Sequence, residues 1–169
     1  MKILFLDRDG VINKKLDDDY VKNWSEFEFM PNIKEVLTKL KPLFDKIVVV
    51  TNQQGIGKKI MTEQDLHILH QKMLSKLHDS QVLIDKIYHC PSLANANDPN
   101  RKPNIGMAKQ VLSDFPKADF SQSWIIGDSI SDMEFGKKAG LNTIFFGQKK
   151  HEFIDFSMEN WLEIQEFFV

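Results

Sequence analysis

Five short apolar runs recur along the chain, and they limit the folds that it can adopt. The runs are residues 3–6, 47–50, 86–88, 124–126 and 143–146. They are rich in β-branched or aromatic residues and are continuous rather than alternating, which is typical of strands buried on both faces of a parallel sheet. The segments between them repeat apolar residues at helical spacing, in stripes at Ile33, Val36, Leu37 and Leu40, at Leu66, Leu69, Met73 and Leu77, and at Ala108, Val111 and Leu112. Strands that alternate with helices predict an α/β fold, a Rossmann-like domain with helices on both faces of one central parallel sheet.

The length of the chain, 169 residues, is typical of a single domain. Two irregular segments, 14–26 and 91–103, do not separate halves that could each fold, so we expect them to be loops over a site rather than linkers. The apolar segment 158–169 predicts a closing helix packed on the core. We therefore expect residues 1–169 to form one domain.

The charge balance and the single cysteine exclude several classes of protein. The chain has 22 basic and 24 acidic side chains, a net charge of −2, which argues against the broad basic face that non-specific nucleic-acid binding needs. No run of about 18 apolar residues is present, so no membrane span is expected. The apolar N-terminal run ends at Asp7 and is too short for a signal peptide, and Cys90 has no second cysteine with which to form a disulfide. We expect a cytoplasmic monomer without nucleic-acid or membrane partners.

Polar residues follow three of the predicted strands at the point where each strand ends. Asp7 and Asp9 follow the first strand, Thr51 and Asn52 the second, and Asp128 the fourth. In parallel α/β sheets ligands bind at the carboxyl ends of the strands. These side chains are therefore expected to converge on one crevice.

Four aspartates are candidates for acid–base chemistry or for binding a cation. Asp7 and Asp9 are two residues apart after a strand, where their carboxylates would repel each other unless a cation or a proton separates them, although a solvated turn would also explain the pair. Asp128 and Asp132 are four residues apart and would lie along the first turn of a helix that begins near Ser129. Their oxygens suit a hard cation such as Mg²⁺, and the alternative is that Asp128 only caps the helix.

The phosphate-binding candidates are polar or basic residues near the same strand ends. Thr51 and Asn52 offer a hydroxyl and an amide to phosphoryl oxygens, and Lys102 would neutralise phosphate charge unless it is an ordinary surface lysine. The segment 55–59, Gly-Ile-Gly-Lys-Lys, has neither the spacing of a nucleotide P-loop nor the third glycine of a dinucleotide fingerprint. ATP and NAD therefore have no support as cofactors.

Taken in chain order, these motifs resemble those of the haloacid dehalogenase-like phosphohydrolases. The motifs are Asp7-Arg8-Asp9-Gly10, Thr51-Asn52, Arg101-Lys102-Pro103, and Gly127-Asp128 with Asp132. Within that superfamily the chain resembles the branch of small histidinol-phosphate and heptose-bisphosphate phosphatases, over about residues 1–147. This resemblance implies a single domain without a large cap domain. Any one motif would be a weak signal, whereas four in this order are specific.

The resemblance implies hydrolysis of a phosphomonoester through an aspartyl-phosphate intermediate. Asp7 would attack phosphorus, and Asp9 would protonate the leaving alcohol and then deprotonate the hydrolytic water. Mg²⁺ would be held by the Asp7 carboxylate, the Asp9 carbonyl and Asp128. Asp132 would support the water shell of the ion.

The same resemblance implies how the substrate is bound. Thr51, Asn52 and Lys102 would bind the transferring phosphoryl oxygens, and Arg101 is a candidate for a contact elsewhere on the substrate. The expected substrate is a small phosphorylated metabolite, with a heptose 1,7-bisphosphate-type sugar preferred and histidinol phosphate as the alternative. The alternatives from other classes are a non-catalytic module that binds a phospholigand and a 3′-phosphatase that acts on nucleic-acid ends.

One segment departs from this branch, in which a loop before Arg-Lys-Pro often binds zinc through four Cys or His residues. Cys90 matches the first ligand, but Ser92, Asp98 and Asn100 stand at the other three positions. We therefore expect no structural zinc, and we expect His89 and Cys90 to pack beside the sheet.

Overall fold

The predicted strands all form, and the four central ones are almost wholly buried. In the computed structural model, which describes residues 1–169, the strands are β1 (Ile3–Leu6), β2 (Lys46–Asn52), β3 (Lys86–Cys90), β4 (Trp124–Gly127) and β5 (Asn142–Phe146). A sixth strand, β6 (Phe156–Met158), has no counterpart in the sequence prediction, because it is only three residues long and mostly exposed. His89 and Cys90 lie within β3 and pair with β2, which corrects the expectation that they pack beside the sheet.

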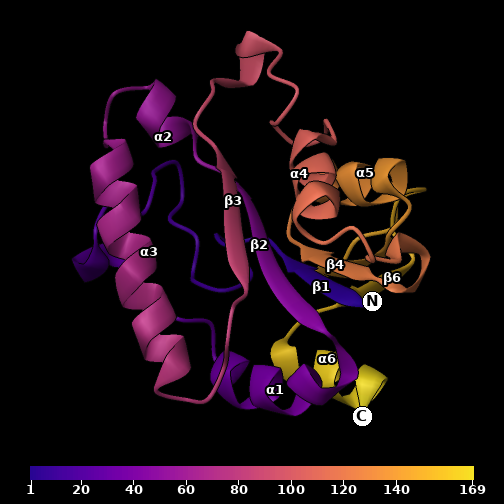
Figure 1. The fold of residues 1–169 in the computed structure, drawn as a ribbon. Coiled ribbons are helices and arrows are strands. Elements are labelled where there is room, and N and C mark those ends of the chain that lie inside the picture. The colour runs from indigo at the N-terminus through magenta and orange to yellow at the C-terminus, as the bar shows by residue number, and fades with distance from the viewer.

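All six strands run parallel in one sheet of order β3-β2-β1-β4-β5-β6 (Figure 1). β1 has β2 on one side and β4 on the other, so the direction in which strands are added reverses between β1 and β4. The pairing continues to Asp7, whose N–H donates to the Ile126 carbonyl at 3.0 Å. Side chains that follow β1 and β4 therefore lie next to each other, where open α/β sheets bind ligands.

Helices cover both faces of the sheet, as predicted. α1 (Ile33–Leu40), α3 (Glu63–His78) and α6 (Trp161–Phe168) pack on one face, and α4 (Gly106–Asp114) and α5 (Ile130–Ala139) pack on the other (Figure 1). α2 (Gln54–Gly57) is a single turn after β2, and short 3₁₀ helices span Trp24–Glu26, Lys41–Leu43, Ala94–Ala96 and Phe120–Gln122. The fold is the predicted Rossmann-like domain without an inserted cap domain. None of its helices combines the length and apolar character that a membrane span requires.

Two cores form because successive side chains of a strand point to opposite faces of the sheet. Leu4 and Leu6 belong to the core under α1 and α6, whereas Phe5 belongs to the core under α4 and α5. The predicted helical stripes are buried except at Leu112, which is 45% exposed. α4 faces its core through Val111, and Leu112 lies one residue further round the helix and so points to solvent.

The C-terminal segment corrects the predicted helix over residues 158–169. Met158 ends β6 and pairs with Phe146, so α6 begins only at Trp161. Asn160 fixes this start, because its side chain accepts two N–H groups of the first turn at 3.0 and 3.1 Å.

Trp161 connects α6 to the backbone of the predicted site. The residue is 1% exposed, and its indole Nε1 donates to the Val11 carbonyl at 2.9 Å. Val11 directly follows the Asp7-Arg8-Asp9-Gly10 motif. The closing helix therefore holds the chain where it leaves the predicted catalytic turn.

We expect Trp161→Phe to lower the free energy of unfolding by about 2–3 kcal/mol, because the smaller ring leaves a cavity and the buried Val11 carbonyl loses this donor. Urea unfolding measures the loss. Leu162→Ala on the same helix is the control, since Leu162 is 47% exposed and should cost less than about 1 kcal/mol. Equal losses in the two variants would contradict the role given to Trp161.

Candidate active site

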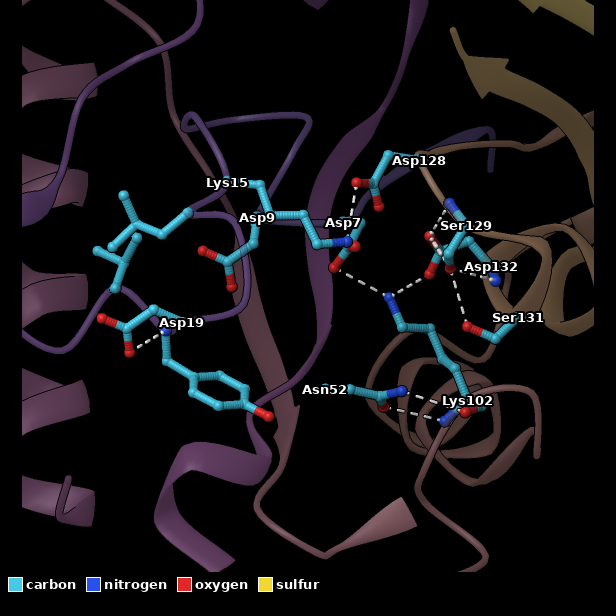
Figure 2. Close-up of a pocket in the computed structure, with 13 residues that line it drawn as sticks. Asp7, Asp9, Lys15, Asp19, Asn52, Lys102, Asp128, Ser129, Ser131 and Asp132 are labelled. Atoms are coloured by element: carbon cyan, nitrogen blue, oxygen red, sulfur yellow. Dashed lines mark hydrogen bonds and ion pairs between the residues drawn. The ribbon is translucent and has the colours of Figure 1, made fainter. Parts of the chain in front are cut away.

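A pocket opens at the carboxyl ends of β1 and β4, and Figure 2 shows the side chains around it. Most of the predicted site residues line it: Asp7, Asp9, Asn52, Lys102, Asp128 and Asp132. Two parts of one loop, residues 15–16 and 19–21, form much of the remaining wall, so the loop 14–26 lies over the site as predicted. The loop 91–103 contributes Lys102 alone.

Three carboxylates lie together in this pocket. One oxygen from each of Asp7, Asp128 and Asp132 lies within 4.8 Å of the other two. Asp132 is held by a capping box, because its carboxylate accepts the Ser129 N–H at 3.0 Å and the Ser129 hydroxyl accepts the Asp132 N–H at 3.2 Å. Ser129 is therefore the N-cap of α5. The alternative that Asp128 only caps the helix is wrong.

Gly10 brings the turn after β1 close to Asp128. It has a φ of +86°, and a Cβ at this position would lie 2.1 Å from Asp128 Oδ2. Only glycine meets both requirements, since other residues disfavour this φ and carry the clashing atom. The turn after β1 can thus lie directly against the carboxylate that follows β4.

Lys102 is the buried cation of the cluster. Its Nζ lies 2.6 Å from Asp132 Oδ1 and 3.0 Å from Asp7 Oδ1, and it donates to the Val50 carbonyl at 2.7 Å. Asn52 fixes the lysine backbone, because its amide donates to the Lys102 carbonyl at 3.1 Å and accepts the Lys102 N–H at 3.0 Å. Lys102 is 3% exposed and is not the surface lysine of the alternative interpretation.

Burial and neighbouring charges change the pKa values in this cluster. Burial, followed by the carboxylates of Asp132 and Asp128, raises the pKa of Asp7 to about 7 against the opposing effect of Lys102. Burial and Asp132 also raise the pKa of Asp128. Burial alone would lower the pKa of Lys102, but Asp132 and Asp7 raise it above its ordinary value, so the ammonium stays charged. The carboxylates outnumber this lysine, and the cluster favours a further cation or a proton.

Asp9 is two residues from Asp7, but its neighbours are a cation and hydrogen-bond donors rather than carboxylates. Its Oδ1 lies 2.8 Å from the guanidinium of Arg8, and its carboxylate accepts N–H groups of Asn13 and Gln53, each at 2.9 Å. Burial alone would raise the pKa of Asp9, but Arg8 and these hydrogen bonds together lower it below its ordinary value. Asp9 is therefore held in its ionised form.

Two of the predicted site residues, Thr51 and Arg101, do not line the pocket. The Thr51 hydroxyl accepts a hydrogen bond from the Gln53 side chain at 2.9 Å, and 1% of the residue is exposed. The Arg101 guanidinium donates to the Ser92 carbonyl at 3.0 Å, within the loop 91–103. Both lie next to lining residues in the chain, but their polar groups have partners elsewhere.

Sequence reasoning did not single out several side chains that line the pocket. These are Lys15, Leu16, Asp19, Tyr20, Val21, Ser129 and Ser131. The loop that contains the first five was assigned to the site as a whole, but it has no periodicity that indicates which side chains turn inward. The two serines lie at the predicted start of α5, and that position is the one signal that points to them.

The loop 91–103 is held by hydrogen bonds centred on Asp98. The Ser92 hydroxyl and the Asn100 N–H donate to its carboxylate, the latter at 2.7 Å, and the Asn104 amide donates to its carbonyl at 2.9 Å. The hydrogen bonds from Ser92 and Asn100 lower the pKa of Asp98. Three of the four positions compared with zinc ligands therefore lie together and bond directly to one another.

The carboxylate cluster fits a hard divalent cation. Its ligand atoms are all oxygens, which Mg²⁺ prefers to nitrogen or sulfur. Asp128 Oδ1 is also buried without any hydrogen-bond partner. A buried carboxylate oxygen in this state is costly, and a cation held by Asp7 and Asp128, with Asp132 beside it, would satisfy it.

The sequence of this chain matches a phosphatase family and is similar to known phosphatases, which agrees with a site suited to phosphate chemistry. Residues 2–159 match the model of the polynucleotide kinase 3 phosphatase family. The D-glycero-alpha-D-manno-heptose-1,7-bisphosphate 7-phosphatase of Campylobacter jejuni subsp. jejuni is 37% identical over 169 residues, which cover 99% of this chain and 95% of the relative. The enzyme of the same name from Mycobacterium tuberculosis strain H37Rv is 41% identical over 131 residues, which cover 78% of this chain and 69% of the relative.

A solved structure has the same fold. The crystal structure of D,D-heptose 1,7-bisphosphate phosphatase from B. bronchiseptica, complexed with magnesium and phosphate, matches with a TM-score of 0.88 at 25% identity. The match covers 99% of this chain and 97% of that chain. The chain therefore belongs to the polynucleotide kinase 3 phosphatase family and is a phosphatase of the haloacid dehalogenase-like hydrolases.

Proposed function

We propose that this phosphatase removes the 7-phosphate of a D-glycero-D-manno-heptose 1,7-bisphosphate, and that residues 1–169 form one catalytic domain. The observation that carries the phosphoryl-transfer chemistry is the buried Lys102 ammonium, 3.0 Å from the carboxylate of Asp7 in the pocket. The choice of sugar follows the C. jejuni relative, of which the chain covers 95%.

Mg²⁺ is the proposed cofactor. The Asp7 and Asp128 carboxylates and the Asp9 carbonyl would hold the ion, and Asp132 would support its water shell. When bound, the ion neutralises phosphoryl charge and orients the group for in-line attack. The unpartnered oxygen of Asp128 and the magnesium in the B. bronchiseptica structure support this assignment.

The proposed reaction has two displacements at phosphorus. In the first, an oxygen of Asp7 bonds to phosphorus and the bond to the sugar oxygen breaks, leaving an aspartyl phosphate. In the second, water attacks the same phosphorus and the bond to Asp7 breaks, which restores the carboxylate and releases phosphate. Lys102 offsets negative charge beside Asp7 in both steps.

Asp9 would move a proton in each step, in opposite directions. It gives a proton to the departing sugar oxygen and later takes one from the attacking water. Its contacts with Arg8, Asn13 and Gln53 favour the ionised form that accepts a proton. The acid form requires these contacts to weaken while substrate is bound.

The remaining contacts are assigned to the substrate. Asn52 and Lys102 bind the phosphoryl oxygens in this proposal. Thr51 joins them through the hydroxyl proton that its hydrogen bond from Gln53 leaves free, and Arg101 contacts the substrate beyond that group once its guanidinium leaves the Ser92 carbonyl. Asn52 also acts through Lys102, whose backbone it holds on both sides.

The alternatives are weighed by the charge of the protein and by the residues of the site. The matched family is described by a polynucleotide phosphatase, but a net charge of −2 gives little support for the broad basic face that binds a phosphodiester backbone. A non-catalytic binding module would leave the paired Asp7 and Asp9 without a role. Histidinol phosphate stays the alternative substrate.

We propose a cytoplasmic monomer without nucleic-acid or membrane partners. We also propose that it binds no structural zinc, because Cys90 is the one thiol of the loop region.

Phosphate release from a substrate panel, with and without Mg²⁺, tests the proposal. The panel contains heptose 1,7-bisphosphate, histidinol phosphate, simple sugar phosphates and a 3′-phosphorylated oligonucleotide. We expect Mg²⁺-dependent release, with kcat/KM for the heptose at least about tenfold above the rest. Mass spectrometry should show loss of the 7-phosphate. A higher kcat/KM for histidinol phosphate or the oligonucleotide would overturn the substrate assignment.

We expect Asp7→Asn to lower kcat by about 10³-fold or more, because the amide cannot form the aspartyl phosphate. Circular dichroism should show an unchanged fold. Asp17→Asn is the matched control, since Asp17 is exposed in the loop over the site, and its kcat should stay within about twofold. Similar activities of the two variants would refute Asp7 as the nucleophile.

The raised pKa of Asp7 predicts how pH affects the stability of the metal-free enzyme. Between the ordinary carboxyl pKa and about 7, the folded protein keeps a proton at Asp7 that the unfolded chain has released. The stability contributed by this group is therefore complete in acid and is lost as the pH rises through about 7.

Asp7→Asn removes this titration, so its free energy of unfolding relative to the native enzyme should rise by about 2 kcal/mol between about pH 5 and about pH 8. Urea unfolding of both proteins in EDTA measures the difference. A difference that is constant over this range would show that Asp7 titrates normally in the folded state.

A further inference from the structure

Lys15 enters the pocket from the loop after β1 and meets the carboxylate cluster. Its Nζ lies 3.1 Å from Asp128 Oδ2, and Figure 2 shows it on the side of the cluster opposite Lys102. The backbone before it is anchored, because the Lys14 N–H donates to the Glu28 carbonyl at 2.8 Å. The Lys15 side chain itself is 58% exposed, against 16% for Asp128.

Lys102 and Lys15 contact different carboxylates of the cluster. Lys102 contacts Asp7 and Asp132 and has no contact with Asp128 within ion-pair distance. Asp128 has one partnered oxygen, which bonds to Lys15, and one oxygen without any partner. Lys15 is therefore the cation that offsets Asp128 in the absence of a metal.

A divalent cation held by Asp7 and Asp128 would repel both ammonium groups of the cluster. The ammonium that is held less firmly is the one that this repulsion can displace. Lys102 is held by the Val50 carbonyl and is buried, whereas Lys15 has a long, exposed and flexible stem. Lys15 is the group that can move at low cost.

We propose that Lys15 takes the place of the divalent cation at Asp128 in the metal-free enzyme and is displaced when Mg²⁺ binds. The inference rests on the proposed metal site. The ion pair reduces the apparent affinity for Mg²⁺ to the intrinsic affinity multiplied by the fraction of molecules in which Lys15 is away from Asp128. Because a half-exposed lysine pair is weak, the expected penalty is about three- to tenfold.

Isothermal titration calorimetry of Mg²⁺ into the metal-free enzyme, without substrate, tests the proposal directly. Lys15→Met keeps the length of the side chain and removes its charge, and it should bind Mg²⁺ about three- to tenfold more tightly than the native enzyme. Lys15→Gln should behave in the same way. Lys14→Met is the matched control, because it loses the same charge but its ammonium pairs with Glu28 at the surface, and its Mg²⁺ affinity should equal that of the native enzyme.

Asp128→Asn separates this inference from the metal site on which it rests. If Asp128→Asn loses Mg²⁺ affinity while Lys15→Met and Lys15→Gln bind as the native enzyme does, the metal site stands and the role of Lys15 is overturned. If Lys14→Met gains as much affinity as Lys15→Met, the effect is one of net charge and the inference is also overturned. No Mg²⁺ binding by any of the proteins would overturn the metal site and the inference together.

Discussion

A buried ammonium between two carboxylates is the interaction on which the site depends. Lys102 is 3% exposed and contacts Asp7, Asp132 and the Val50 carbonyl. Taking these charges out of water is costly unless every partner is in place. The partners come from the end of β1, the first turn of α5 and β2, so the sheet, the helix and the loop that carries Lys102 must be assembled together. Asn52 completes the arrangement by holding the lysine backbone.

Asp7 and Asp9, the two aspartates of the turn after β1, have different surroundings and therefore opposite pKa shifts. Asp7 lies among other carboxylates and has a raised pKa, whereas Asp9 lies against Arg8 and has a lowered one. Arg8 is fully buried, and its other side meets His70 Nε2 at 3.2 Å. Burial and then Arg8 lower the pKa of His70 to about 3, so His70 is neutral and Asp9 is the charged partner of Arg8. Two identical side chains, two residues apart, thus differ in protonation, and the proposed attack by Asp7 depends on a cation that keeps its carboxylate ionised.

The positions of the strand-end residues could be predicted from the sequence, because the pairing of the strands alone determines them. Continuous apolar runs predict a parallel sheet, and the ends of its strands bring Asp7 and Asp128 together although they are far apart in the chain. No comparable rule predicts from sequence which side chains of two loops contact each other. The inward turn of Lys15 and the hydrogen bond of Arg101 to Ser92 depend on loop backbones that no repeating pattern describes. The short strand β6 was missed for a related reason, since three mostly exposed residues have no periodicity.

Without a cap domain, the wall of the pocket must come from loops, and the contacts of Tyr20 explain how one loop is fixed. Tyr20 lines the pocket, its hydroxyl accepts a hydrogen bond from Gln54 at 2.6 Å, and Lys58 Nζ lies 5.0 Å from the centre of its ring. Gln54 begins α2, directly after the strand that carries Asn52. The loop wall is therefore connected to the same strand end that holds Lys102, so this wall and the proposed phosphate-binding residues share one support. A substrate that displaces Tyr20 would also disturb α2, which favours ligands that fit the wall as it stands.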